Sequence, residues 1–571
     1  MTDGTNLDES DRYADRVFEV ASRSPRQWAA AVVLGFAETT NLSIAGRRFD
    51  LHGSGPNAAA LEALLTAIGA RRVAAGEAPD YLFLSGEGET PLGAAEAAAL
   101  AADRDRPLLL VDAAPSVPEG AESSGLTDVL PSKHPLRAGV RATSVPRLIV
   151  VRLDGTRHGP HDTPAADRIA WARRFMPTSG RLAERLAEDR TVRGTRIGVS
   201  MVLEPKTAVL ALRLQEAGAE VSVFAHPDET DDKVAAALRE AGIRVFARSA
   251  AGPAEHRDLA LAFLEERPAV LVDDGSHVIR LAHESAPQLL DGMIGAAEET
   301  TSGLRPLRAM AAEGRLRIPV VAVNDARSKT LFDNRYGTGQ SCLFTILGLT
   351  GLDLHGATVV VAGYGPVGEG VARHARAFGA SVVVAELDPV RALAATYDGF
   401  RVSRLIDAVA SADLVVSATG VRDTITVEVL QACAPSAVVA VAGGVPQEVA
   451  VEAALAAGAT RETVGWKREQ LSFPGGTSVE LLDDGGCINV TAGEGNPIEI
   501  MDLSFAVQLS AIRHLVESAG TLALGVHPLP ADADDAVAAQ ALAAAGLRVD
   551  EAATAAPASA ATFPPRFGGA A

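Results

Sequence analysis

Short runs of apolar residues alternate with alanine-rich stretches of helical periodicity along almost the whole chain. Such runs are typical of strands buried in parallel sheets, and the stretches between them are typical of helices that cover both faces. The pattern therefore predicts an α/β architecture from end to end.

Residues 1–164 are predicted to form an extra N-terminal α/β domain that ends in a linker. Strands are expected at residues 30–35, 81–84, 107–111 and 147–152, and a helix is expected at residues 57–69. Residues 156–164 are polar and punctuated by proline and glycine, which is typical of a linker.

Two further α/β units follow, one from about residue 165 and one between about residues 334 and 492. The segment 551–571 is rich in alanine and proline, which predicts a flexible tail.

Composition and charge narrow the functional classes. The chain has 571 residues and a mass of 58.9 kDa, enough for about three or four domains. Its net charge of −20 disfavours nucleic acids and anionic membrane surfaces as partners. Three cysteines without a CxxC pair disfavour a disulfide scaffold and a structural zinc site. The N-terminus is polar, and the longest apolar stretch, residues 28–37, is too short to span a bilayer. We therefore expect a cytoplasmic protein without a metal site.

The strongest motif is a buried strand that leads into Gly363-x-Gly365-x-x-Gly368 and then into a helix. The first glycine permits the tight turn, the second lets a pyrophosphate approach the backbone, and the third lets helix and strand pack closely. The motif predicts a Rossmann-type dinucleotide site.

Pro366 and Val367 lie in the same turn and are expected to contact the cofactor. Glu386 stands 18 residues beyond Gly368, at the end of the next predicted strand. A carboxylate there accepts hydrogen bonds from a ribose diol and repels a 2′-phosphate. We therefore expect NAD rather than NADP.

Further motifs follow one another in the order and spacing of a known family. They are Arg193-Gly-Thr-Arg-Ile-Gly, Thr207-Ala-Val-Leu, Gly218-Ala-Glu-Val, Val272-Asp-Asp-Gly275, Gln288-Leu-Leu, Glu298-Glu-Thr-Thr-Ser-Gly303, Asn324-Asp325, Lys329, Phe332-Asp-Asn-x-Tyr-Gly337 and Gly525-Val-His. With the glycine motif, they make residues 165–550 resemble the S-adenosylhomocysteine hydrolase family.

This resemblance implies a Rossmann NAD-binding domain inserted in an α/β substrate domain. The substrate domain would span residues 165–333 and be completed by residues 493–528, with the NAD-binding domain at 334–492 and a C-terminal helix and tail at 529–571. It also implies a homo-oligomer, a tetramer or dimer, that holds NAD as a recycled cofactor and acts on an adenine nucleoside.

Four catalytic roles carry over by position. The resemblance places Asp274 beside the ribose C4′–H, Glu299 at the ribose hydroxyls, and Lys329 with Asp333 at the 3′-hydroxyl proton. Independently of the resemblance, Lys329 and Asp333 are four residues apart and share one helical face. A surface ion pair is the alternative interpretation of that spacing.

Other positions are implied to contact the cofactor or the substrate. The cofactor-side positions are Thr300, Thr301, Ser302, Asn334, Thr419 and Asn489. The substrate-side positions are Glu204, Thr207 and Asn496, together with Asp274, Glu299, Lys329 and Asp333.

The sequence also departs from the family's pattern. Val202, Gly444 and Asn496 stand where the family has histidines around the nucleoside, and Thr338 stands where it usually has cysteine. The tail lacks the lysine and tyrosine by which the family reaches a neighbouring subunit's NAD. The cofactor half is thus retained, whereas the substrate half is rewritten.

Three functions are open at this point. The leading hypothesis is a nucleoside dehydratase that oxidises the sugar, removes the adjacent C–H and eliminates water, as in angustmycin-type antibiotic biosynthesis, with His277, Glu494 or Glu204 as the general acid. The alternatives are an S-adenosylhomocysteine hydrolase and a non-catalytic regulator that binds NAD or adenosine.

Overall fold

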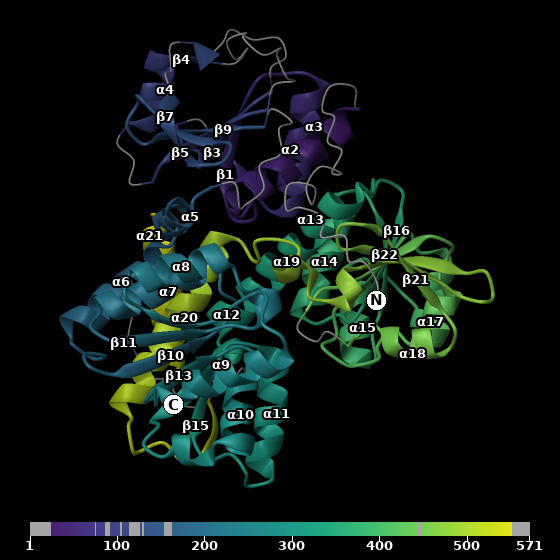
Figure 1. Cartoon of the computed structure of the whole chain (residues 1–571). Coiled ribbons are helices and arrows are strands. Elements are labelled where there is room, and N and C mark those ends of the chain that lie inside the picture. Colours follow the sequence, from purple (N-terminus) through teal and green to yellow (C-terminus); the bar gives the residue numbers. More distant parts are fainter. Residues whose placement is uncertain are drawn as a thin grey trace, which may run out of the picture.

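The computed structural model describes residues 24–550, except residues 75, 86–91, 103–105, 114–125, 128–130, 154–162 and 444–446. Three large sheets, each accompanied by helices, divide this part of the chain into three units (Figure 1). The α/β architecture predicted from the apolar pattern is confirmed. Gly444, the predicted tail at 551–571 and most of the predicted linker at 156–164 lie outside the described residues.

The first unit is built on a seven-stranded sheet in the order β2-β1-β3-β5-β9-β8-β7. Its pairs are parallel from β2 to β9 and antiparallel from β9 to β7. The elements are α2 (Pro25–Thr40), β1 (Arg48–His52), α3 (Pro56–Ile68), β2 (Arg71–Arg72), β3 (Tyr81–Leu84), β4 (Leu92–Gly93), α4 (Ala94–Ala101), β5 (Leu108–Asp112), β6 (Leu126–Thr127), β7 (Pro131–Arg137), β8 (Val140–Thr143) and β9 (Leu148–Arg152). The predicted strands at 81–84, 107–111 and 147–152 and the predicted helix at 57–69 are confirmed as β3, β5, β9 and α3.

The strand predicted at residues 30–35 is wrong, because this segment is helical and lies within α2. Ser24 caps the helix and forms a capping box with Gln27. Residues on the buried face recur at helical spacing, and Phe36 packs on the ring of Tyr81 with 4.7 Å between centroids. An apolar run of this length does not separate a strand from a fully buried helix.

The second unit has an all-parallel sheet in the order β12-β11-β10-β13-β14-β15-β24. The strands are β10 (Arg196–Ser200), β11 (Glu220–Phe224), β12 (Arg244–Phe246), β13 (Val270–Asp273), β14 (Gly295–Glu298), β15 (Pro319–Ala322) and β24 (Gly525–Pro528). The helices are α5 (Ala165–Arg174), α6 (Pro177–Glu188), α7 (Pro205–Glu216), α8 (Asp232–Glu240), α9 (Pro253–Glu265), α10 (His277–Ser285), α11 (Thr301–Ala312), α20 (Ile498–Glu517) and α21 (Ala531–Ala544). Because β24 comes from the far end of the chain, the third unit is an insertion in this one.

The third unit has an eight-stranded sheet in the order β18-β17-β16-β19-β20-β23-β22-β21, parallel up to β23 and antiparallel beyond it. The strands are β16 (Thr358–Ala362), β17 (Ser381–Ala385), β18 (Arg401–Val402), β19 (Leu414–Ser417), β20 (Ala437–Val441), β21 (Thr460–Gly465), β22 (Arg468–Ser472) and β23 (Ser478–Leu482). The helices around it are α13 (Gly339–Thr350), α14 (Pro366–Ala377), α15 (Pro389–Tyr397), α16 (Leu405–Ala408), α17 (Val427–Ala432), α18 (Val451–Ala456) and α19 (Ile488–Thr491). The exact domain boundaries stay a prediction.

The connection between the second and third units carries an unusual helix. The short helix α12 (Arg327–Lys329) continues into the π-helix η5 (Thr330–Thr338), which leads into α13. A π-helix is a wide turn that is frequent at functional sites. No helix in the described ranges is long and apolar enough to cross a membrane.

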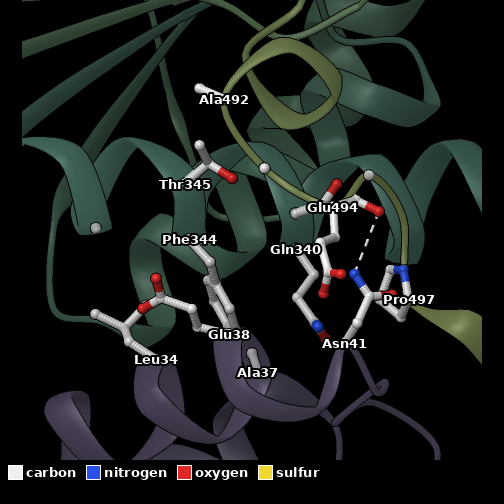
Figure 2. Close-up of a pocket in the computed structure, with 14 residues that line it drawn as sticks. Leu34, Ala37, Glu38, Asn41, Gln340, Phe344, Thr345, Ala492, Glu494 and Pro497 are labelled. Carbon is white, nitrogen blue, oxygen red and sulfur yellow. Dashed lines mark hydrogen bonds between the residues drawn. The ribbon is translucent and has the colours of Figure 1, made fainter. Parts of the chain in front are cut away.

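The first unit docks against the first turn of α20 and the loop before it. The backbone N–H of Ile498 donates to the carbonyl of Asn41, and the N–H of Ser43 donates to Glu499. In Figure 2, α2 residues face α13 and the segment 492–497 across a cavity of about 90 Å³. The first unit therefore packs on both other units.

A buried charge network fixes this contact. Arg137 of the first unit pairs with Glu494, which also accepts from Arg168 at 3.3 Å. The Lys206 ammonium donates to the Glu494 carbonyl at 2.7 Å. Burial opposes ionisation of Glu494, but Arg137 and Arg168 lower its pKa to about 2. Because Glu494 is paired with two arginines and carries no proton near neutral pH, it is disfavoured as a candidate general acid.

We predict that Glu494→Gln destabilises the protein by about 3–5 kcal/mol, because Arg137 is left buried without its carboxylate. The control is Glu517→Gln, which removes an exposed partner of Arg513 and should change stability by less than about 1 kcal/mol. Thermal and urea unfolding measure both. Since the folded pKa is lowered, this stabilisation is present above pH 4.5 and disappears as the pH falls towards 2. Equal midpoints for the two variants would contradict the buried network.

Candidate active site

A cavity of about 1570 Å³ lies between the second and third units, where the carboxyl ends of both parallel sheets meet. Ligands of open α/β sheets bind at such carboxyl ends. Asp274, Glu299, Lys329 and Asp333 line one side of the cavity, and the glycine turn at 363–368 lines the other. The structure thus brings the predicted catalytic and cofactor residues to one site.

The catalytic side is centred on the buried ammonium of Lys329. It lies 2.8 Å from Asp333 and 3.8 Å from Glu299, and it donates to the side-chain oxygen of Asn334 at 2.9 Å. Lys329 is only 3% exposed, so the surface ion pair considered as an alternative is excluded. The i,i+4 contact forms across the start of the π-helix.

Burial and charge tune this cluster in opposite directions. Burial opposes the charge on Lys329, but Asp333 and Glu299 raise its pKa. Burial raises the pKa of Glu299 to about 7 and that of Asp274 to about 6, although the Lys329 charge lowers both. Near neutral pH, the cluster therefore contains a cation, an ionised Asp274 and a Glu299 close to its titration midpoint.

Helix α20 supports the cluster from the side of the second unit. Ser504 and Gln508 donate to the two carboxylate oxygens of Glu299, and Ser504 also donates to Asp333 at 3.2 Å. These two residues were missed from the sequence, because their helix follows the catalytic motifs by more than 150 residues. Their polar side chains among the apolar residues of the buried face of α20 were the available signal.

Asn496 and Asn489 form a second layer around Asp333. The Asn496 amide donates to Asp333 and to Thr338 at 3.2 Å, while its oxygen accepts from Ser341 at 2.9 Å and from Asn489 at 3.0 Å. All polar atoms of Asn496 are therefore engaged within the protein. The structure places its amide against the Asp333 carboxylate on the cavity wall.

Two carboxylates missed from the sequence hold the loop that carries Asp274. Glu298 accepts from the backbone N–H groups of Gly275, Ser276 and Thr300, and burial raises its pKa well above the usual value. Asp273 accepts from the N–H groups at the start of α10. Each adjoins a cavity residue in the sequence, and paired acids at two strand ends were the signal for them.

The predicted substrate-side residues all line the cavity, but Glu204 is engaged in local bonds. Glu204 accepts from the N–H groups of Lys206 and Thr207 as the N-cap of α7, and it pairs with the Lys206 ammonium at 2.8 Å. Its assignment as a general acid is therefore disfavoured. His277 faces His226, with 4.8 Å between ring centroids, and burial lowers the pKa of His277.

On the cofactor side, the turn has the geometry that a dinucleotide requires. Gly363 has φ of +94°, and a Cβ at Gly368 would lie 2.0 Å from the Gly363 carbonyl oxygen. The turn thus brings the start of α14 against the end of β16, and Gly365, Pro366 and Val367 face the cavity. This close approach, which any side chain at Gly368 would block, fits bound NAD.

Glu386 directly follows β17 and lines the cavity, as predicted. Its carboxylate accepts from the backbone N–H groups of Tyr364, Leu387 and Asp388 at 2.6–2.9 Å. These bonds hold the carboxylate beside the glycine turn, where a ribose diol of NAD would lie.

The remaining cofactor-side positions also line the cavity. They are Thr300, Thr301, Ser302, Asn334, Thr419 and Asn489. Thr300 caps α11 by accepting from Gly303. Glu448, which was missed from the sequence, accepts from Ser417 and from the backbone of Thr419 and Gly420, and so fixes the Thr419 loop. No cluster of three metal-binding side chains occurs among the residues that the structure describes.

Two family models match the chain. Residues 334–495 match "S-adenosyl-L-homocysteine hydrolase, NAD binding domain", and residues 165–289 match "S-adenosyl-L-homocysteine hydrolase". Both matches lie C-terminal to the first unit.

Three curated relatives have similar sequence identity to this chain, 40% or 41%. The adenosylhomocysteinase of Thermotoga maritima is 40% identical over 390 residues, which are 67% of this chain and 95% of the relative. The S-inosyl-L-homocysteine hydrolase of Methanopyrus kandleri is 41% identical over 389 residues, which are 67% of this chain and 91% of the relative. The adenosylhomocysteinase of Archaeoglobus fulgidus is 41% identical over 390 residues, with coverages of 67% and 95%.

We predict that Gly368→Ala weakens NAD binding by roughly 10- to 100-fold, because the new Cβ would separate α14 from the Gly363 carbonyl. Calorimetric titration of NAD into cofactor-free protein measures the affinity. Gly252→Ala is the control, since Gly252 has φ of −73° and no atom within 4 Å of the added Cβ. Unchanged affinity in Gly368→Ala would show that the dinucleotide does not use this turn.

Proposed function

Because the chain belongs to the S-adenosyl-L-homocysteine hydrolase family, we propose that it is an NAD-dependent enzyme that removes the C5′ substituent of a purine nucleoside. We further propose that this substituent is homocysteine in thioether linkage, as in the substrates that the relatives' names specify. The observation that carries the proposal is the buried cluster of Lys329, Asp333, Glu299 and Asp274 on one cavity wall.

NAD, when bound, supplies the reversible oxidation of the 3′-hydroxyl to a ketone. The buried Lys329–Asp333 pair faces the cavity, and its Asp333 carboxylate receives the proton of that hydroxyl. The Lys329 ammonium holds this carboxylate in place at 2.8 Å. Glu299 binds the ribose hydroxyls and keeps the sugar in register with this pair. Ser504 and Gln508 restrict Glu299 to one orientation.

Asp274 is the base that removes the C4′ proton. A neighbouring ketone makes C4′–H acidic, so a carboxylate is a sufficient base. The backbone bonds of Glu298 and Asp273 fix the loop around Asp274, which limits the motion of its carboxylate. The electron pair left at C4′ then expels the C5′ substituent.

Two charged residues of the cavity wall support the proposal that the C5′ substituent is an amino acid in thioether linkage. Arg280 and Asp228 line the cavity and both act on His277, whose pKa Arg280 lowers and Asp228 raises. One cation and one anion complement the carboxylate and ammonium of homocysteine. The relatives' names include adenosyl and inosyl substrates, so the purine base of the nucleoside can be adenine or hypoxanthine.

A nucleoside dehydratase is the second candidate function. Val202 lines the cavity without a titratable group, and Asn496 is fully engaged with Asp333, Thr338, Ser341 and Asn489. These two positions therefore offer no group to return water to the elimination product. This favours a reaction that stops at elimination, with a hydroxyl as the leaving group.

Incubation of the NAD-loaded protein in heavy water, followed by mass spectrometry, tests the proposal. With S-adenosylhomocysteine or S-inosylhomocysteine, we expect free homocysteine and one deuterium at C4′. Loss of one water from a hexulosyl adenine nucleoside would instead establish the dehydratase. Lys329→Met should lose at least about 100-fold in rate while it still binds NAD, and Lys233→Met on the exposed surface of α8 is the control. If no nucleoside gives a product or takes up deuterium, the remaining interpretation is a non-catalytic regulator.

The pH dependence of C4′–H exchange is the next prediction. The base must be ionised to accept the proton, and burial raises the pKa of Asp274 to about 6. Exchange should therefore be slow at pH 5 and increase as the pH rises through 6, with a further change near 7 as Glu299 titrates. Deuterium uptake at saturating nucleoside measures the profile. A rate that falls over this range would contradict Asp274 as the base.

A further inference from the structure

A part of the cavity next to Asp274 is not used by the chemistry described so far. Its walls are formed by Val202, His226, Glu229 and His277, and we call it the acid bay. It lies at the carboxyl ends of β10, β11 and β13, in the cavity that Asp274, Arg280 and Asp228 also line.

Backbone pairing fixes Glu229 in the acid bay. Residues Pro227–Glu229 form a short 3₁₀-helix after β11. The Leu203 N–H donates to the Glu229 carbonyl at 2.9 Å, and the Asp231 N–H donates to the Leu203 carbonyl at 3.0 Å. An isolated parallel bridge joins Leu203 to Thr230. The backbone of Glu229 is thereby held beside Leu203, and both Val202 and Glu229 line the cavity.

The Glu229 carboxyl group is free to serve a ligand. It is half-buried and lines the cavity, and no hydrogen bond or ion pair within the described residues engages its oxygens. Burial, together with the negative charges of Asp274 and Asp228, raises its pKa to about 8. Near neutral pH this carboxyl group therefore carries a proton.

The other titratable groups around Glu229 are weaker proton donors. Burial lowers the pKa of His226 to about 3 and also lowers that of His277, so both imidazoles are neutral. Burial raises the pKa of Cys487 to about 12, with contributions from Glu229 and Asp274. Asp274 is ionised above about pH 6. Among these neighbours, Glu229 is the acid with a proton that is available near pH 7.

We propose that Glu229 is the catalytic acid that protonates the C5′ substituent as it leaves, an assignment that rests on the proposed function. Asp274 takes the C4′ proton, and the C4′–H electron pair becomes the C4′=C5′ double bond. The bond from C5′ to sulfur or oxygen breaks with its electron pair on that atom, which takes the proton of Glu229. The products are a neutral thiol or water, an enone, protonated Asp274 and ionised Glu229.

This arrangement keeps the charge of the site constant. Before the step, Asp274 is ionised and Glu229 is neutral, and after it the negative charge has moved from one carboxyl group to the other. Because creating an extra charge in a buried cavity is unfavourable, an exchange of one charge between two neighbouring acids lowers the barrier. The two carboxyl groups interact electrostatically, since the negative charge of Asp274 raises the pKa of Glu229.

The test is Glu229→Gln, which keeps the size of the side chain and removes the acid. With S-adenosylhomocysteine, we expect leaving-group release to fall at least about 100-fold while C4′ deuterium exchange persists. With 5′-chloro-5′-deoxyadenosine, whose chloride leaves without a proton, release should stay within about threefold of the unmodified enzyme. Glu229→Asp should restore part of the release. Glu240→Gln, on the exposed end of α8, is the matched control and should leave both rates unchanged.

Infrared spectroscopy of the ligand-free protein gives a readout other than activity. A protonated carboxyl band at pH 7 should be lost in Glu229→Gln and kept in Glu240→Gln. Equal release from S-adenosylhomocysteine by Glu229→Gln and the unmodified enzyme would overturn the assignment, as would equal losses with the thioether and the chloride. If the unmodified enzyme neither exchanges C4′–H nor releases a leaving group from any nucleoside, the proposed function itself fails, and the assignment fails with it.

Discussion

The site depends on one constraint, the cost of burying the charge of Lys329. An isolated ammonium in a protein interior is strongly destabilising unless opposite charges and hydrogen bonds compensate it. Asp333, Glu299 and Asn334 provide this compensation, and they reach it from the π-helix and from the end of β14. Through Ser504 and Asn496, the same charges also fix α20 and the loop before it. The contacts of the Lys329 ammonium thus hold the π-helix that connects the second and third units.

At the ends of two adjacent strands, one acid of each pair binds backbone N–H groups and the next acid faces the cavity. Successive residues of a strand point in opposite directions. At β13, Asp273 binds the start of α10 while Asp274 faces the cavity, and at β14, Glu298 binds backbone N–H groups while Glu299 faces the cavity. The acids that support the loops and the acids that face the cavity therefore occupy neighbouring positions in the sequence.

Local patterns predicted much of this arrangement, and long-range pairing accounts for what they missed. The glycine turn and the Lys329–Asp333 pair both depend on residues that are close together in the sequence. As expected, Gly368 packs against the Gly363 carbonyl, and Lys329 contacts Asp333. The buried pairing of Glu494 was not predicted, because its partner Arg137 is 357 residues away. The position of Glu229 follows from the pairing of Leu203 with Thr230, which no local period reveals. The strand predicted at residues 30–35 failed because burial alone does not distinguish a helix from a strand.

The contact between Arg137 and Glu494 also affects how the protein is made. A ribosome that adds about 5–20 residues per second reaches Glu494 roughly 20–70 seconds after Arg137. During that interval, the first unit exposes the arginine and the surface that later cover the loop before α20. The early part of the nascent chain must therefore stay soluble without its partner, and its docking completes only when synthesis is nearly finished.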